Sequence, residues 1–423
     1  MRTADPQNTQ QTSTRLIVFD VEGVLIPKRR YLLFEASRRV SIPNFIKMLW
    51  AGLLYEAGLT SLETALRTIY KQLSGLTLDD LLQLFKKIPL IPGAQEVTQH
   101  LKQAGFKIAL ISSGLPQNFI ENLATQHNCD YAFGFELETS HGRLTGQISG
   151  DVIKPGGKAL VLKRIMENES LTPQNCVLVA DDRNNLPMFN LCSTRIGYNP
   201  DFLLANKSDI VVKGDLRETL PKLTGEAPSK MHSVSKNDVL RETVHVSGFL
   251  VALFTMYFGF NHFWVAFIII VVTFTYIISE LSRMLGVNIP LVSTVTWHAA
   301  LQPEVHEFVT APIFFALGIV LALLIFPAPV NYASIAIFCF GDGFATVFGK
   351  VIGRHIIPYN KGKGIEGTIS GLIFAILGAL IFVNPQKAVA GALAAMIVET
   401  LPAPINDNLT MPLAAGLAML FIP

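Results

Sequence analysis

The sequence has little charge for its length: 16% of its 423 residues are Asp, Glu, Lys or Arg, against about 25% in ordinary soluble domains. Half of the residues are hydrophobic and the mean hydropathy is +0.41, which excludes a single soluble globule. The chain also lacks a basic excess, and its net charge of +2 argues against nucleic acid as a partner. Its four cysteines are far apart in the sequence, so neither a disulfide framework nor a zinc site is indicated.

The few charges are unevenly distributed along the chain. Before residue 241 there are 27 Lys and Arg and 24 Asp and Glu, but from residue 241 onward there are only 7 and 8. We therefore interpret residues 15–223 as a soluble domain and residues 239–423 as a membrane domain. Residues 1–14 lack the apolar run of a signal peptide, so we expect a disordered leader there. The polar stretch 224–238 is interpreted as the linker.

Short apolar runs in the first half predict buried parallel strands. They lie at 15–20, 107–112 and 176–181, are bounded by turn residues and are separated by helical patterns. This order predicts an α/β Rossmann-like parallel sheet. The stretch between the first two runs, about 28–90, has helical periodicity and few strand signals, so we expect a helical cap inserted after the first strand.

The second half contains seven apolar segments, several of them shorter than the roughly 20 residues of a straight membrane span. We expect an all-α domain of about seven transmembrane helices, with six as the alternative count. If residue 238 is cytosolic, seven spans place the loops 279–307, 349–366 and 399–410 on the cytosolic side, where positively charged loops are favoured. The segments are 239–260, 263–278, 308–326, 332–348, 367–383, 388–398 and 411–422.

Four residues of the soluble domain have the types and the order that phosphoester chemistry on a parallel sheet needs. Asp20 ends the first apolar run and is a candidate nucleophile, and Ser112 ends the second as a phosphate-binding hydroxyl. Lys158 follows the sequence Lys-Pro-Gly-Gly and begins a helical pattern, where its charge can neutralise a phosphate. Asp181 ends the third run and is a candidate ligand for Mg²⁺.

In this order and spacing the chain resembles the haloacid dehalogenase superfamily, and the helical cap makes it most similar to the phosphoserine phosphatase branch. The resemblance implies that Asp20 forms an aspartyl-phosphate and that Glu22 is the general acid and base and donates a backbone carbonyl to Mg²⁺. It also implies that Ser112 and Lys158 hold the phosphoryl oxygens of a small phosphomonoester. The metal-binding positions that it implies are Asp20, Asp181 and Asn185.

Two positions depart from the pattern of that superfamily. Glu22 stands where most members have the shorter Asp, and Asn185 stands where a second carboxylate is usual. The loss of one negative charge at Asn185 is expected to weaken Mg²⁺ binding. Asp182 is adjacent in sequence but is expected to point elsewhere. These departures keep open the alternative that the domain is a regulatory module without turnover.

The second half places ionisable residues within or beside its apolar segments, where they are costly and usually mark function. Asp342 lies inside the fourth segment between glycines, and Asp407 precedes the last segment. A glycine-rich stretch between them carries several cations, which can surround a polyphosphate. The candidates are Asp342, Lys350, Arg354, Lys361, Lys363, Glu366, Glu399, Asp407 and Asn408, with Arg241 and His245 before them.

This combination resembles the dolichol kinase, phytol kinase and CTP-dependent diacylglycerol kinase family, which is related to the CDP-lipid synthases. The resemblance implies transfer of the γ-phosphoryl group of CTP to a lipid alcohol such as a polyprenol, dolichol or phytol. Asp342 and Asp407 would be catalytic, and Asp342 and Glu366 would bind Mg²⁺. Lys350, Arg354, Lys361 and Lys363 would hold phosphates, and Asn408 would orient a ligand.

Alternatives to this interpretation remain open on the residues alone. Arg241 and His245, like Glu280 and Arg283, are equally consistent with structural ion pairs. A cytidylyltransferase is a related alternative, whereas a transporter is disfavoured because no inverted repeat is found. The sequence thus predicts an integral multi-pass membrane enzyme, in contact with membrane lipids, that joins a cytoplasmic phosphatase domain to a lipid kinase.

Overall fold

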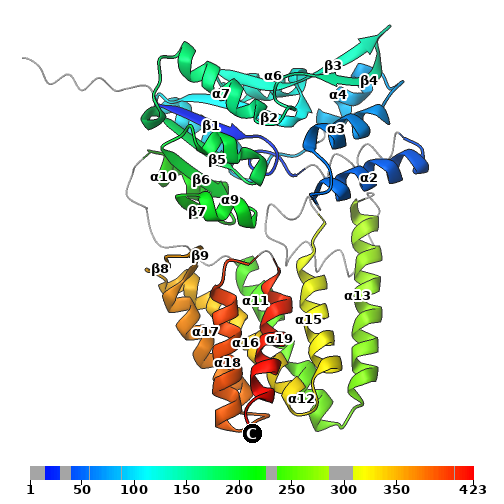
Figure 1. The fold of residues 1–423 in the computed structure, drawn as a ribbon, viewed down its shortest axis with the longest axis vertical. Coiled ribbons are helices and arrows are strands. Elements are labelled where there is room, and N and C mark those ends of the chain that lie inside the picture. The colour runs from blue at the N-terminus through cyan, green and yellow to red at the C-terminus, as the bar shows by residue number, and fades with distance from the viewer. Residues whose placement is uncertain are drawn as a thin grey trace, which may run out of the picture.

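The computed structural model describes residues 15–28, 40–56, 58–86, 88–224, 236–284, 308–403 and 405–423. The expected leader 1–14 and most of the expected linker lie outside the described residues. Figure 1 shows an α/β domain at one end of the molecule and a helical bundle at the other, with the C-terminus at the end of the bundle remote from the α/β domain.

A seven-stranded sheet with the order β4-β3-β2-β1-β5-β6-β7 forms the centre of the α/β domain. All neighbours are parallel except β3 and β4. The sheet confirms the predicted Rossmann-like class, and three of its strands match the predicted apolar runs. The strands are β1 (Leu16–Asp20), β2 (Lys107–Pro116), β3 (Tyr131–Ser140), β4 (Arg143–Ser149), β5 (Cys176–Ala180), β6 (Thr194–Tyr198) and β7 (Ile210–Val212).

Because β1, β2 and β5 are parallel neighbours, their carboxyl ends lie at the same edge of the sheet. β1 is in the middle and every one of its residues is buried. Helices flank the sheet: α5 (Ala94–Gln103), α6 (Gln117–Gln126), α7 (Gly157–Asn168), α8 (Leu186–Phe189), α9 (Phe202–Lys207) and α10 (Leu220–Thr224), with 3-10 turns η1 (Pro173–Asn175), η2 (Arg183–Asn185) and η3 (Leu216–Thr219).

The range predicted as a cap contains the helices α2 (Ile42–Glu56), α3 (Leu62–Lys71) and α4 (Leu78–Lys86). Residues 29–39, 57 and 87 of that range are not described. Ser61 caps α3 by accepting a hydrogen bond from the Thr64 N–H. The Tyr70 hydroxyl on α3 donates to the Gly114 carbonyl oxygen on β2, at 3.2 Å. This bond attaches the cap above the carboxyl ends of the strands.

The second half is helical, as predicted, and helices of spanning length account for part of the expected spans among the described residues. Among the described residues three helical stretches are long and apolar enough to cross a membrane: 239–257, 262–283 and 330–352. The other apolar segments form helices too short to meet that criterion, so seven spans are not confirmed. The helices are α11 (Lys236–Ser247), α12 (Phe249–Tyr257), α13 (His262–Met284), α15 (Ala311–Ile325), α16 (Val330–Ile352), α17 (Ile365–Ala379), α18 (Pro385–Thr400) and α19 (Asp407–Leu420).

The outer faces of the bundle are apolar, as a membrane environment requires. On α17, Ile369, Ile373 and Leu377 recur every four residues and each is more than 50% exposed. On α13, Trp264 and Val272 are 66% and 62% exposed. A water-soluble protein rarely exposes so continuous an apolar surface. These faces therefore indicate that the bundle is associated with a membrane.

A short hairpin connects the bundle to the α/β domain. It consists of β8 (Ile356–Ile357) and β9 (Asn360–Gly364), and β9 lies against α9 and β7. The Lys361 Nζ donates to the Ser208 carbonyl oxygen at 2.5 Å. The Tyr359 hydroxyl donates to Thr400 at the end of α18. The loops 349–366 and 399–410 therefore lie at the end of the bundle that faces the α/β domain, whereas 285–307 lies outside the described residues (Figure 1).

Candidate active site

The nucleophile candidate Asp20 is positioned by a tight turn at the end of β1. The Val21 N–H donates to Asp20 Oδ1 at 2.9 Å, and the Gly23 N–H donates to the Ile26 carbonyl oxygen at 2.7 Å. Gly23 has a φ of +80°, and a Cβ at this position would lie 2.1 Å from Asp181 Oδ2. Glycine is therefore required here, because any side chain would displace the carboxylate of Asp181.

Lys158 and Asn185 both contact the carboxylate of Asp20. The Lys158 Nζ lies 2.9 Å from Asp20 Oδ1 and donates to Asn185 Oδ1 at 3.0 Å. The Asn185 Nδ2 donates to the other oxygen of Asp20. Burial raises the pKa of Asp20, although Lys158 opposes the shift. Burial by itself would lower the pKa of Lys158. The negative charges of Asp20, Asp182 and Glu22 have a larger combined effect and raise it.

Three carboxylates provide the oxygen donors of a divalent cation site. One oxygen each of Asp20, Asp181 and Asp182 lies within 4.8 Å of the others. Burial raises the pKa of Asp181 to about 8 although Lys28 opposes the shift, so a cation bound at the cluster would favour the ionised carboxylate at neutral pH. Hard oxygen ligands of this kind suit Mg²⁺. The cluster therefore fits the metal that the sequence predicts.

The expectation that Asp182 points elsewhere is wrong. Asp182 caps the turn η2, where its Oδ1 accepts hydrogen bonds from the Asn184 N–H and the Asn185 Nδ2 at 3.0 Å each. This capping geometry turns its carboxylate toward Asp20. Asn185, which the sequence places among the metal ligands, directs its amide nitrogen to Asp20 and its amide oxygen to Lys158. Asp182 thus restores the negative charge that Asn185 lacks.

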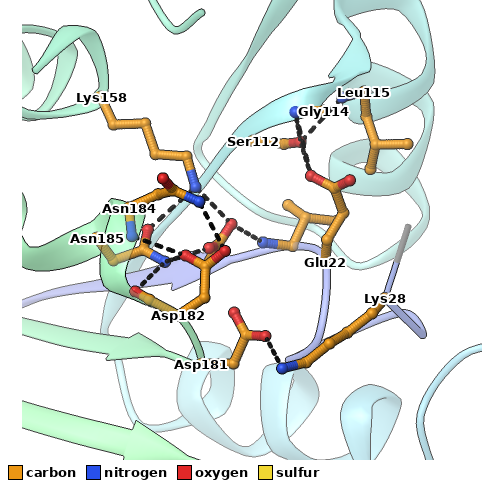
Figure 2. A network of polar contacts seen from close by, with 12 residues as sticks. Glu22, Lys28, Ser112, Gly114, Leu115, Lys158, Asp181, Asp182, Asn184 and Asn185 are labelled. Atoms are coloured by element: carbon orange, nitrogen blue, oxygen red, sulfur yellow. Dashed lines mark hydrogen bonds and ion pairs between the residues drawn. The ribbon is translucent and has the colours of Figure 1, made fainter. Parts of the chain in front are cut away.

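A lysine that the sequence analysis did not select lies at the metal cluster. The Lys28 Nζ is 2.9 Å from Asp181 Oδ2, and this ion pair is visible in Figure 2. The carboxylate is 4% exposed and the lysine side chain 41% exposed. Lys28 therefore neutralises a buried acid from the solvent side of the cluster.

We expect Lys28→Met to bind Mg²⁺ about tenfold more tightly than the unaltered protein, because the ion pair with Asp181 no longer competes with the metal. Calorimetric titration of the full-length protein with Mg²⁺ measures the affinity directly. Lys154→Met is the matched control, since Lys154 pairs with Asp151 on the surface. Equal affinities in all three proteins would contradict the competition.

Glu22 binds the two groups that are expected to hold a phosphoryl oxygen. Its Oε2 accepts hydrogen bonds from the Ser112 Oγ at 2.9 Å and from the Gly114 N–H at 3.1 Å. A Cβ on Gly114 would lie 2.2 Å from Glu22 Oε1, so glycine makes room for a side chain one methylene longer than Asp. The Ser112 hydroxyl and the Gly114 N–H can donate hydrogen bonds to a phosphoryl oxygen only when Glu22 releases them.

A cavity of about 280 Å³ opens between the cap and the sheet. The end of α2 and the start of α3 contribute Tyr55 and residues 60–63, and the α/β core contributes Ser113, Lys158 and Asn184. Lys158, which lines the cavity, donates a hydrogen bond to Asp20. The cavity therefore leads toward the nucleophile candidate. Its size accommodates a small phosphorylated molecule or a headgroup. Sequence reasoning did not select Tyr55 or Glu63, because cap residues carry no motif.

Residues 17–190 match the model of the haloacid dehalogenase-like hydrolase family. A phosphoserine phosphatase of Archaeoglobus fulgidus is 31% identical over 204 residues, which are 48% of this chain and 58% of the relative. One from Methanocaldococcus jannaschii is 28% identical over 207 residues, 49% of this chain and 96% of the relative. A solved structure of a phosphoserine phosphatase with a phospho-aspartyl intermediate analogue is 27% identical to this chain and has a TM-score of 0.46. The match covers 50% of this chain and 99% of the chain of that structure.

The first half of the chain therefore contains a region similar to haloacid dehalogenase-like hydrolases. Within that superfamily its similarity is to phosphoserine phosphatases. The chain spans little more than half of the Archaeoglobus relative, and each of these matches covers about half of this chain. Phosphatases of this superfamily generally use Mg²⁺, which agrees with the carboxylate cluster.

A second polar cluster lies where the bundle faces the α/β domain. The Lys363 Nζ contacts Glu399 Oε1 at 2.5 Å and Asp407 Oδ2 at 3.0 Å. Nearby, His245 Nε2 lies 3.4 Å from Asp342 Oδ2. The charge of Asp342 acts on Lys363 and on Glu399, so the two pairs form one electrostatic cluster. The structure thus brings together five of the residues selected from the sequence.

One carboxylate oxygen of Glu399 lacks a hydrogen-bond partner among the cluster residues that the structure describes. The residue is 3% exposed, and its Oε2 has no hydrogen-bond partner among the described residues. His245 Nε2 is likewise buried without a hydrogen bond in the described part of the chain, although Asp342 is at ion-pair distance. Buried polar atoms without partners are costly, so these two atoms are candidates to bind a further group such as a ligand or a water molecule.

Lys213, on the loop after β7, is a residue of this cluster that sequence reasoning missed. A Cβ on Gly362 would lie 3.1 Å from the Lys213 Nζ, so the lysine tip rests on β9. The charges of Lys363, Asp407, Glu399 and Arg241 act on it. Among the described residues Lys213 has no hydrogen bond or ion pair. The α/β domain therefore contributes a cation to the polar cluster of the bundle.

Other selected residues lie apart from this cluster. Glu366 pairs with His355 at 2.6 Å, and no hydrogen bond or ion pair between described residues joins it to Asp342. Arg354 is exposed in the loop after α16, and Lys350 lies in the last turn of that helix. Lys361 contacts Ser208, and Asn408 lies in the first turn of α19 beside Gly318 of α15.

Arg283 and Glu280 form a structural ion pair, which is one of the two interpretations that the sequence left open. They form an ion pair at 2.6 Å, and Glu280 Oε1 also accepts a hydrogen bond from the Val309 N–H at 2.9 Å. Arg241 lies 3.9 Å from Glu242, and its charge also acts on Lys213 and His245. Arg241 thus has a neighbouring acid and lies within electrostatic range of the polar cluster.

Proposed function

We propose that the α/β domain hydrolyses a small phosphomonoester through an aspartyl-phosphate on Asp20. The observation that carries this proposal is the buried contact of Asp20 with Lys158 at 2.9 Å beside the carboxylates of Asp181 and Asp182. Asp20, Asp181 and Asp182 would hold Mg²⁺. The metal supplies positive charge that offsets the charge of the phosphoryl group.

The chain's own residues account for the remaining chemistry. An oxygen of Asp20 attacks phosphorus, the bond to the leaving oxygen breaks, and Glu22 donates a proton to that oxygen. Glu22, then a carboxylate, removes a proton from a water molecule that attacks the acyl phosphate, which frees Asp20 and phosphate. Lys158 binds phosphoryl oxygens, and the Ser112 hydroxyl does so once Glu22 has released it. Hydrogen bonds from Ser112 and Gly114 already hold Glu22 beside this site.

The cavity limits the substrate to a small molecule or a small headgroup. Phosphoserine is a candidate because the named relatives are phosphoserine phosphatases. The test is release of inorganic phosphate by the full-length protein with Mg²⁺ and phosphoserine, p-nitrophenyl phosphate or a lipid phosphomonoester in vesicles. Hydrolysis of any of them supports the proposal. If none is hydrolysed at saturating Mg²⁺, the alternative of a regulatory module without turnover replaces it.

For the bundle we propose CTP-dependent phosphorylation of a lipid alcohol, as the resemblance of its motifs implies. The hydroxyl oxygen of the lipid attacks the γ-phosphorus, CDP leaves, and Asp342 or Asp407 takes the hydroxyl proton. What supports this function is the cluster of Lys363, Glu399 and Asp407 with its unpartnered Glu399 oxygen. A related cytidylyltransferase would form pyrophosphate instead of CDP, so product analysis separates the two reactions.

We also propose that the α/β domain and the loops 349–366 and 399–410 are cytoplasmic. Both loops lie at the end of the bundle facing that domain, and they carry Lys350, Arg354, Lys361 and Lys363.

Cysteines introduced in a background without the native cysteines should therefore label from the same side of the membrane at Lys222 and at His355. The measurement is the reaction of sealed, oriented vesicles with an impermeant maleimide. Detergent-opened vesicles provide the control for full reactivity. Labelling of the two positions from opposite sides would refute this topology.

A further inference from the structure

The cap helix α2 exposes a continuous apolar face. Ile42, Ile46, Trp50 and Leu53 are 76%, 58%, 61% and 49% exposed, and Leu49 is 37% exposed. Their spacing of three to four residues places them on one side of the helix. The opposite side is buried, with Met48 1% and Ala51 6% exposed, and packs into the α/β domain. The exposed residues are therefore not needed for the core of that domain.

The position of α2 argues for a particular partner. In Figure 1 the helix lies at the side of the α/β domain, directly above the upper end of α13. The bundle below it has exposed apolar faces on α13 and α17. A bilayer around these faces has its polar surface near the level of α2. The exposed face of α2 thus continues the apolar surface of the bundle outward.

We propose that α2 lies in the surface of the bilayer that surrounds the bundle and brings the cap to it. An interfacial helix has an apolar face that enters the headgroup region and cations that contact anionic lipids. Lys47 is exposed on α2, and Arg38 and Arg39 precede the helix in the sequence. Trp50 is a residue type that favours the boundary between lipid and water.

The end of α2 links this surface to the phosphatase site. Tyr55 lines the cavity, its ring lies under the guanidinium of Arg183, and its backbone carbonyl accepts a hydrogen bond from Arg183 at 3.0 Å. The Tyr55 hydroxyl also contacts Asn184, next to Asn185. A helix in the bilayer surface therefore ends at the mouth of the cavity. On the basis of the proposed phosphatase function, the substrate class is a phosphomonoester carried on a lipid headgroup.

Tryptophan fluorescence tests the position of α2 independently of any activity. The chain has three tryptophans, so replacing Trp264 and Trp297 with Phe leaves Trp50 as the only emitter. The full-length protein is placed in vesicles of phosphatidylcholine and phosphatidylglycerol that contain brominated acyl chains. We expect the brominated lipids to quench Trp50 and iodide to quench it weakly. Trp264 alone, on the exposed face of α13, is the control for a residue in contact with lipid.

A tryptophan introduced by Leu160→Trp in the tryptophan-free protein is the control for an exposed position away from the bilayer. Leu160 lies on α7 and is 45% exposed. Quenching of Trp50 by iodide to the level of position 160, with none by brominated lipids, would overturn the proposal. Shielding of Trp50 from both quenchers would also overturn it, because a second copy of the chain or another segment would then cover α2.

A second experiment compares the hydrolysis rates of two substrates by one double variant of α2. Ile46→Asp with Leu53→Asp should lower hydrolysis of a long-chain phosphomonoester in vesicles about tenfold, while hydrolysis of p-nitrophenyl phosphate stays within twofold. Leu160→Asp should change neither rate. Equal losses on both substrates would refute the role of α2 in lipid access. If the unaltered protein hydrolyses neither substrate, the proposed phosphatase function fails, whereas the quenching result still decides where α2 lies.

Discussion

Asp20→Asn should lower the phosphatase rate at least a thousandfold and remove the covalent phosphoenzyme. An amide is not a nucleophile toward phosphorus at neutral pH, so the first covalent step cannot occur. The Asn side chain keeps an oxygen that accepts the hydrogen bond from Lys158, which preserves the local fold. Acid quenching after reaction with a ³²P-labelled phosphomonoester, followed by electrophoresis, measures the phosphoenzyme.

The matched control is Asp79→Asn, because Asp79 is exposed on α4 of the cap. It should retain both the rate and the label. A labelled phosphoenzyme in Asp20→Asn would show that another residue is the nucleophile.

Lys363→Gln should reduce phosphoryl transfer from CTP to a lipid alcohol at least a hundredfold. The substitution removes the cation shared by Glu399 and Asp407 and leaves the buried carboxyl of Glu399 without its ion-pair partner. Asp342→Asn, which removes the acid beside His245, should be similarly damaging. Transfer of label from γ-³²P CTP to phytol or dolichol, resolved by thin-layer chromatography, measures the reaction.

Two further variants separate catalysis from folding in the bundle. Lys387→Gln changes a lysine near the start of α18, about 18 Å along that helix from Glu399, and should leave the rate unchanged. Lys363→Arg keeps the charge and should recover part of the activity. A near wild-type rate in both Lys363→Gln and Asp342→Asn would refute the kinase assignment of this cluster.

The strands and the acids at their ends could be predicted because their cause is local. A buried parallel strand needs a continuous apolar run, and the residue after it lies at the sheet edge, so Asp20 and Asp181 were found from short patterns. β3 and β4 were not predicted, because they are partly exposed and their residues resemble a loop. The orientation of Asp182 depends on the turn η2, which Asp182 caps. The sequence around Asp182 did not predict this turn.

The contacts between the two halves were beyond prediction for a different reason. Lys213 has no motif around it, and it becomes significant only because β9 packs against β7. Lys28 was missed because its partner Asp181 is far away in sequence. The count of seven spans is not confirmed, because short apolar helices that pack within a bundle have the same composition as short spans. Apolar composition alone does not measure how far a helix extends.

The hairpin strand β9 contacts both the α/β domain and the helical bundle. Lys361 bonds Ser208 of the α/β domain, and Lys363, two residues later, bonds Glu399 and Asp407 of the bundle. If the α/β domain tilts while Lys361 stays bound, the strand moves and changes the reach of Lys363. If a ligand at Asp20 changed this tilt, it would alter affinity in the polar cluster, and by thermodynamic reciprocity a ligand in that cluster would alter affinity at Asp20.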